Sequence, residues 1–149
     1  MQTIKIASCL GFQVEEDTIT ALNSDHEVLP FDMISQLELG VKEGILEKAG
    51  GVYAFVHDIL HQAVYDLIKP DNRTLLHKTI GDTLLENHAS NSSLSSSDSL
   101  LKAVDQINIY IKDCNTSPSC EQCSQYSHAN AKAAELVMTA QSFEQGKLL

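Results

Sequence analysis

The sequence has few basic residues for its length. Ten lysines and arginines stand against twenty aspartates and glutamates in 149 residues, which gives a formal net charge of −10. A surface of this sign repels the phosphates of nucleic acids at long range. Direct nucleic-acid binding is therefore not expected, and basic partners fit this overall charge better.

Long apolar runs are also missing, and no segment approaches the length of a membrane span. The opening stretch MQTIKIASCLG lacks the apolar core and the cleavage site of a signal peptide. Four cysteines without such a signal favour reduced thiols over a disulfide framework. We therefore expect a cytoplasmic protein that does not contact membranes.

The apolar residues, 43% of the chain, are enough to bury a core, and most recur at helical spacing. Residues 4–10 predict one helix that stops at Gly11, and a second helix is predicted from 14 to 22. The stretch 31–46 predicts a third helix. Its expected apolar face consists of Phe31, Ile34, Leu37, Leu39, Val41 and Ile45.

The stretch LEKAGGVYAFV, residues 46–56, predicts a β-hairpin around Gly50 and Gly51. Its second strand places Tyr53 and Phe55 on one face. Three helices followed by a hairpin is the order of a winged helix. We therefore predict a mainly α fold whose first domain, residues 1–69, is a winged-helix domain.

The rest of the chain predicts a helical region over residues 70–149. The helix from 57 is expected to end before Pro70. Three further helices are predicted over 71–88, 98–113 and 124–143. Residues 89–99 form a serine-rich loop too polar to pack. The alanine-rich last helix permits close approach in an antiparallel stack, and because it has no partner helix the chain reads as a fragment or a truncated gene model.

Three stretches together carry a resemblance to a known family. They are IASCLGFQVEEDTITAL, GVKEGILEKAGGVYAFVHDILHQAVYDLI and RTLLHKTIGDTLLEN, in this order. They resemble the region after the nucleotide-binding core in STAND-class signal-transduction ATPases, and in particular predicted ATPases of the AAA (Orc1-like) type. The resemblance implies a winged helix followed by the first helices of a tetratricopeptide-like (TPR-like) superhelix, with ATP or ADP and Mg²⁺ bound by an ATPase domain outside this chain.

The resemblance also gives a role to the sequence FVHD, residues 55–58. It is similar to the Met-His-Asp motif of nucleotide-binding resistance and apoptosis proteins, whose histidine contacts the ADP phosphate in the closed state. This implies a nucleotide-sensing role for His57, with Asp58 orienting the helix start. Val56 stands where that motif has methionine, and His61 stands where the closer family often has glutamine.

A simpler interpretation of the pair is a helix cap. Asp58 would then bind the amides of the first helical turn, and His57 would pack at the hairpin. His77 also matches the family pattern, but it lies beside an apolar stripe and reads as a packing histidine.

Two metal sites are conceivable. The sequence HDILH places His57 and His61 four residues apart, as in zinc proteases, but aspartate replaces the catalytic glutamate and no third ligand is evident. A second candidate zinc site combines one CxxC pair with two more potential ligands. Its residues are Cys114, Cys120, Cys123 and His128. Reduced surface cysteines are the alternative.

The sequence contains no GxxxxGK[ST] loop, so we expect no catalysis and no cofactor in this chain. The expected function is that of a regulatory fragment of a signalling ATPase. Its winged helix would couple the nucleotide state of the ATPase domain to a helical protein-interaction region. The alternatives are a helical interaction scaffold and a DNA-binding winged helix. The last would read DNA with the stretch FDMISQLELGVKEG, whose acidic charge has the wrong sign.

Overall fold

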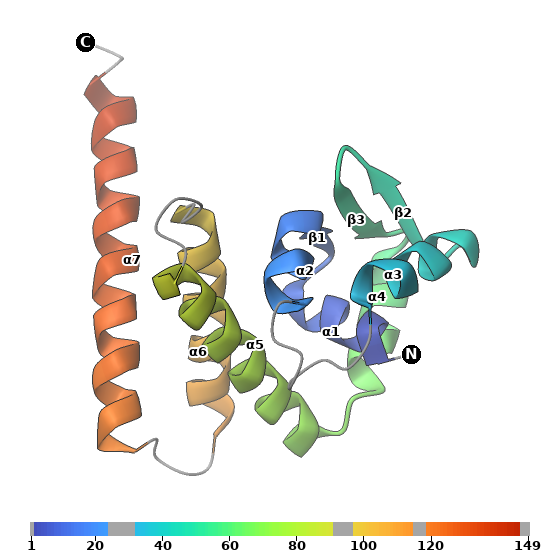
Figure 1. Cartoon of the computed structure of the whole chain (residues 1–149), viewed down its shortest axis with the longest axis horizontal. Helices are drawn as coiled ribbons and strands as arrows, with labels where there is room; N and C mark the ends of the chain where they lie inside the picture. Colours follow the sequence, from blue (N-terminus) through green and yellow to red (C-terminus); the bar gives the residue numbers. More distant parts are fainter. Residues whose placement is uncertain (1, 24–31, 91–96, 115–118, 147–149) are drawn as a thin grey trace.

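The computed structural model describes residues 2–23, 32–90, 97–114 and 119–146. This part of the chain is mainly helical, with one small three-stranded antiparallel sheet (Figure 1). The first half consists of α1 (Gln2–Leu10), β1 (Gln13–Glu15), α2 (Glu16–Asn23), α3 (Met33–Lys42), β2 (Leu46–Ala49) and β3 (Val52–Phe55). The second half consists of α4 (Asp58–Asp66), α5 (Pro70–Ser90), α6 (Ser97–Asp113) and α7 (Cys120–Gly146).

The sheet has the strand order β1-β3-β2. The predicted hairpin is present as β2 and β3, and its turn residues Gly50 and Gly51 have φ of 57° and 78°. Positive φ at both central residues is what a two-residue hairpin turn requires, and glycine adopts it without strain. β3 pairs on its other side with β1, so that Val14 lies opposite Tyr53.

The strand β1 is a correction to the sequence prediction, which began a helix at Val14. That helix, α2, begins at Glu16, and Gln13–Glu15 is extended. Three residues are too few to show an alternating pattern, and the strand exists because β3 offers it an edge. Here a long-range pairing overrides the local sequence signal.

Several other predicted boundaries and faces also differ. Leu39 is 49% exposed although it was placed on an apolar face, and Phe31 lies outside the described residues. α4 ends at Asp66, and Pro70 opens α5, where its missing N–H costs nothing. The serine-rich loop predicted over residues 89–99 is shorter, because α5 extends to Ser90 and α6 begins at Ser97.

A lysine and a tyrosine of the sheet bind the same glutamate of α3. Lys48 of β2 lies 2.7 Å from a carboxylate oxygen of Glu38 and 3.1 Å from one of Glu16. The hydroxyl of buried Tyr53 donates to Glu38 at 2.8 Å. These contacts fix the hairpin against α2 and α3. They also pair the positive charge of Lys48 with carboxylates of the same chain.

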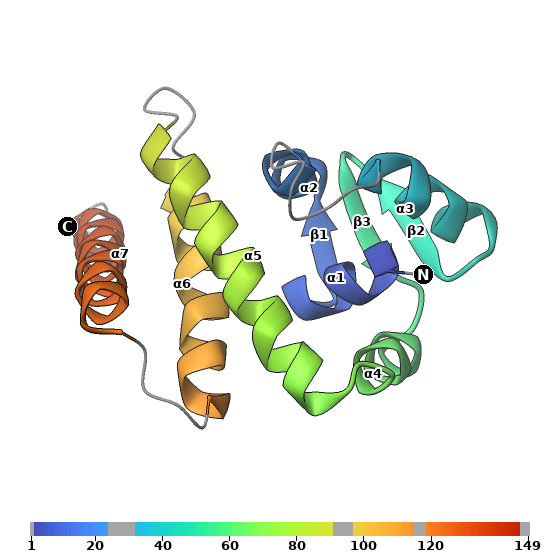
Figure 2. The same ribbon diagram turned by 60° about the horizontal axis from the view of Figure 1, so that its bottom comes forward.

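Helices α5, α6 and α7 run antiparallel to one another in sequence order, and both views show α7 on the outer side of α6 (Figures 1 and 2). One hydrophobic core continues from α1 and the sheet into this stack, with Ile6 and Phe55 at one end and Ile107 and Ala133 at the other. Within the described residues, no helix is long and apolar enough to span a bilayer.

α5 approaches α6 closely at Gly81. A Cβ atom there would lie 2.7 Å from Cγ1 of Ile107 and 3.2 Å from both the carbonyl oxygen of Ala103 and the backbone nitrogen of Ile107. Glycine therefore lets the two backbones pack at a distance that a larger residue would not allow.

Candidate functional site

The predicted nucleotide-sensing pair lies where β3 passes into α4. His57 is the N-cap of α4, with extended backbone at φ −145° and ψ 143°. Its carbonyl oxygen accepts hydrogen bonds from the amides of Leu60 and His61 at 3.1 and 3.2 Å. Its backbone therefore starts the helix, while the side chain is exposed and makes no capping hydrogen bond.

Asp58 is also exposed, and one of its carboxylate oxygens accepts a hydrogen bond from the amide of Ile59 at 2.8 Å. The cap interpretation is therefore met in part, because Asp58 binds one amide of the first turn. The expected packing of His57 at the hairpin is not found, because this residue is exposed. Within the described part of the chain, no hydrogen bond links the two side chains.

His61 anchors the same helix to α1. Its Nε2 lies 2.9 Å from the carbonyl oxygen of Ser8. A carbonyl can only accept, so Nε2 carries the proton. The ring lies edge-on to Phe55, with centroids 5.1 Å apart, and stacks on Tyr65 at 6.4 Å. The structure thus gives His61 a packing role that sequence reasoning missed.

A chain of polar contacts continues from Tyr65 into the helical stack. The Tyr65 hydroxyl lies 3.0 Å from Nε2 of His77, and Nδ1 of His77 lies 2.7 Å from Oε1 of Gln106. The amide nitrogen of Gln106 donates to the carbonyl oxygen of Cys9 at 3.0 Å. Because Oε1 accepts, Nδ1 of His77 carries the proton and Nε2 accepts from Tyr65.

His77 is buried and neutral. Burial is the main cause that lowers its pKa below the ordinary 6.5, and it outweighs the opposing hydrogen bond to Gln106. The prediction of a packing histidine at this position is confirmed by these two satisfied ring nitrogens. Sequence reasoning missed Gln106, although a glutamine at the edge of the apolar stripe of residues 98–113 was a usable signal.

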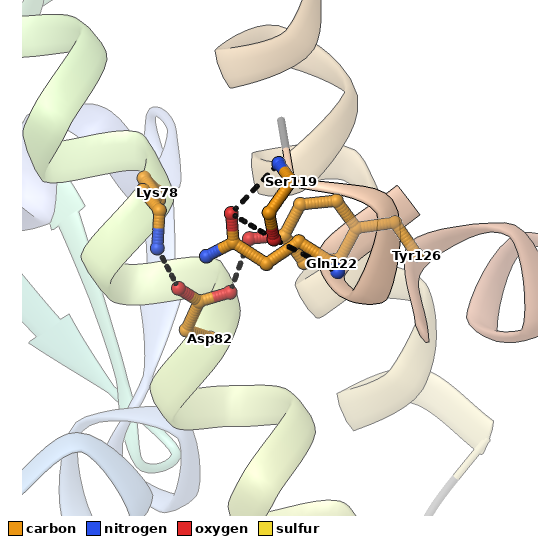
Figure 3. A network of polar contacts seen from close by, with 5 residues as sticks. All are labelled: Lys78, Asp82, Ser119, Gln122 and Tyr126. Atoms are coloured by element: carbon orange, nitrogen blue, oxygen red, sulfur yellow. Dashed lines mark hydrogen bonds and ion pairs between the residues drawn. The ribbon is translucent and has the colours of Figure 1, made fainter. Parts of the chain in front are cut away.

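A second polar cluster joins α5 to the start of α7 (Figure 3). Asp82 accepts from Lys78 with one oxygen and from the hydroxyl of Tyr126, at 2.7 Å, with the other. Burial, followed by the hydrogen bond to Asp82, raises the pKa of the Tyr126 hydroxyl, so it stays protonated and donates. Beside it, Ser119 and Gln122 exchange backbone and side-chain hydrogen bonds of 3.3–3.4 Å, which is a capping box.

The two metal-site hypotheses fare differently. The HDILH pair does not form a site, because Nε2 of His61 is bound to the Ser8 carbonyl and His57 is exposed. The described residues contain no group of three or more potential metal ligands. The side chain of Cys120 lies outside the described part, so reduced cysteines stay the prediction here and zinc at Cys114, Cys120, Cys123 and His128 stays the alternative.

The junction between β3 and α4, which we call the seam, combines an exposed side chain with the start of a helix. It offers an exposed imidazole beside the first turn of α4, whose amides favour an anion. The same helix is tied to α1 through His61 and to α5 through Tyr65. In comparisons with known proteins, no family model, no curated protein and no solved structure matches this chain.

Proposed function

We propose that this chain is a non-catalytic regulatory region of a STAND- or AAA (Orc1-like)-type signal-transduction ATPase. Residues 1–69 would act as its winged-helix domain, and residues 70–149 as the start of a TPR-like, antiparallel helical region that binds protein partners. The ATPase domain, outside this chain, would hold ATP or ADP with Mg²⁺. The order of three helices and a hairpin supports the winged-helix assignment.

The observation that carries the proposal is the exposure of His57 at the start of α4. Its backbone carbonyl already begins the helix, so the imidazole has no part in the cap and is available to a ligand. A histidine beside a helix N-terminus can donate to a diphosphate while the amides of the first turn add to the attraction.

The position of α4 provides a route for coupling. A contact that His57 makes only in the ADP-bound state stabilises that state by the difference in contact energy. Because His61 and Tyr65 tie α4 to both α1 and α5, a shift of α4 must be accommodated on both sides. The nucleotide state would in this way reach the helical region.

The structure disfavours the DNA-binding alternative on charge. Lys48, the basic residue on β2, is paired with Glu16 and Glu38, and α3 begins after Asp32 and ends before Glu43. A helix of this sign does not suit the major groove.

The test is ADP dissociation from the full-length parent protein, in which a GxxxxGK[ST] loop should lie before these residues. A charge-assisted hydrogen bond contributes about 1.5–3 kcal/mol, so His57→Ala should weaken ADP retention by about 10- to 150-fold. The matched control is His128→Ala, another exposed histidine, which lies on α7. The melting temperature should barely change in either variant, because neither side chain is buried.

Asp58→Ala forms a second arm. It should cost about 1 kcal/mol of local stability through loss of the bond to the Ile59 amide. It should reduce ADP retention only if the carboxylate also positions His57. Equal ADP retention in wild type and His57→Ala would reject nucleotide sensing and leave the helical scaffold as the better function.

A further inference from the structure

A groove of about 500 Å³ lies between α1, the end of α4 and the first half of α5. Its volume falls within the roughly 300–1,000 Å³ of ordinary ligand pockets. Apolar side chains from both sides line it, and they are Ile6, Leu67, Ile68, Leu75 and Leu76. We call this the α1–α5 groove, and Figure 2 shows the three helices that surround it.

Two of the leucines are largely exposed. Leu67 is 64% and Leu75 is 60% exposed, whereas the neighbouring Ile6 and Ile68 are buried in the core. The groove therefore has an apolar floor that belongs to the core and apolar rims that stand in water. Covering two such leucines is favourable for any partner with apolar side chains of its own.

The charge of the groove is opposite to that of the chain. Lys5 and Lys69 line it, and among the described residues that line it there is no aspartate or glutamate. Neither lysine has a carboxylate within ion-pair distance in the described part of the chain, whereas Lys48 and Lys102 each have two and Lys78 has one. In a chain with a net charge of −10, this is a local positive site with apolar walls.

We propose that the α1–α5 groove binds an acidic amphipathic helix of a partner protein. Apolar residues of that helix at i, i+3 or i+4, and i+7 would cover Leu67 and Leu75, and its flanking carboxylates would pair with Lys5 and Lys69. The floor of the groove favours a peptide over a simple anion, because an anion would leave both leucines in water. This site is independent of His57 and of nucleotide.

A displayed peptide library tests the preference directly. Each member is a 12-residue segment with leucine at helical spacing and Asp, Glu, Lys or Ser at the other positions. The net charge of the chain favours basic peptides, so enrichment of acidic members indicates a local positive site. Enrichment of basic or neutral members would overturn the proposal.

Charge reversal then locates the site. The binding constant of an enriched acidic peptide is measured by fluorescence anisotropy with the whole chain and with the double variant Lys5→Glu/Lys69→Glu. An exposed ion pair contributes a factor of about 1.4 to 5, and reversal replaces attraction with repulsion at two lysines, so binding should weaken by about fourfold or more. The control Lys42→Glu/Lys112→Glu makes the same change in net charge on α3 and α6. Equal weakening by both double variants would refute the site.

Leu75→Ser tests the apolar contact without a change of charge. Because Leu75 is largely exposed, the variant should fold with an unchanged melting temperature, and peptide binding should weaken about five- to tenfold. Unchanged binding would overturn the proposal. So would a dimer of the chain that Leu75→Ser dissolves, or binding to phosphatidylserine vesicles that Lys5→Glu/Lys69→Glu abolishes, because the groove would then serve a second copy or a membrane.

Discussion

Substitution of Gly81 by alanine tests whether the close approach of α5 and α6 limits the stability of the fold. Alanine is favoured over glycine inside a helix by about 1 kcal/mol, so helix propensity alone predicts stabilisation. Overpacking of a filled interface costs about 1–3 kcal/mol. The new Cβ would meet Ile107 at 2.7 Å, and two of its three close neighbours are backbone atoms.

Backbone atoms of α6 cannot turn aside as a side chain can, so the cost should lie in the upper part of that range, about 2–3 kcal/mol. After the gain in propensity, Gly81→Ala should lower the free energy of unfolding by about 1–2 kcal/mol. For a chain of this length, that corresponds to a fall of about 2–8 °C in melting temperature. Urea unfolding, followed by circular dichroism, gives the free energy, with the m-value as a check on two-state behaviour.

Gly40 in α3 provides the matched control. A Cβ there would meet side-chain atoms only, Cδ1 and Cγ of Leu46 at 3.0 and 3.4 Å and Cδ1 of Ile4 at 3.6 Å. These can shift by a few tenths of an ångström, so Gly40→Ala should leave stability unchanged or raise it by up to about 1 kcal/mol. If Gly81→Ala stabilises the protein as much as Gly40→Ala does, the argument from close backbone packing is wrong.

Three further predictions concern pH, α7 and catalysis. Stability should fall as the pH drops below about 6.5, because His77 takes up a proton in the unfolded chain, whereas burial lowers its pKa in the folded chain. His77→Gln should reduce this pH dependence of the melting temperature between about pH 5 and 7. Tyr126→Phe removes a hydrogen bond to the Asp82 carboxylate and should cost about 1.5–3 kcal/mol, seen as faster amide exchange in α7 and little change in the sheet. An unchanged exchange rate would show that α7 is held by packing alone. The purified chain should not hydrolyse ATP, and turnover above buffer that survives further purification would contradict the proposed non-catalytic role.

Local signals in the sequence were sufficient for most of the fold. The Gly-Gly turn and the alternation of Tyr53 and Phe55 predicted the hairpin, and the structure confirms β2 and β3. Gly11 also ends α1 as predicted, with φ of 127°. These features were predictable because the conformation depends on the residue itself or on its immediate neighbours.

Features that depend on distant residues were not predictable in this way. β1 is extended only because β3 lies beside it. The contacts at the start of α4 were not predictable either. The pattern HDILH does not reveal that His61 binds α1 while His57 is exposed. Residues four apart lie on the same side of a helix, so the spacing of His57 and His61 predicts only that they are neighbours. Their burial and hydrogen bonding depend on which face of α4 is covered by α1.

The hydrogen bond from Gln106 to Cys9 has a consequence for how such a protein can be divided. It reaches from the sixth helix back to the first, across the boundary expected near residue 69. Cutting the chain there would leave the Cys9 carbonyl without its donor and Nε2 of His77 without the Tyr65 hydroxyl that donates to it, in a place where water does not easily replace them. The two regions are therefore not interchangeable modules, and a graft of another helical region onto residues 1–69 would succeed only if it supplied an amide at the position of Gln106.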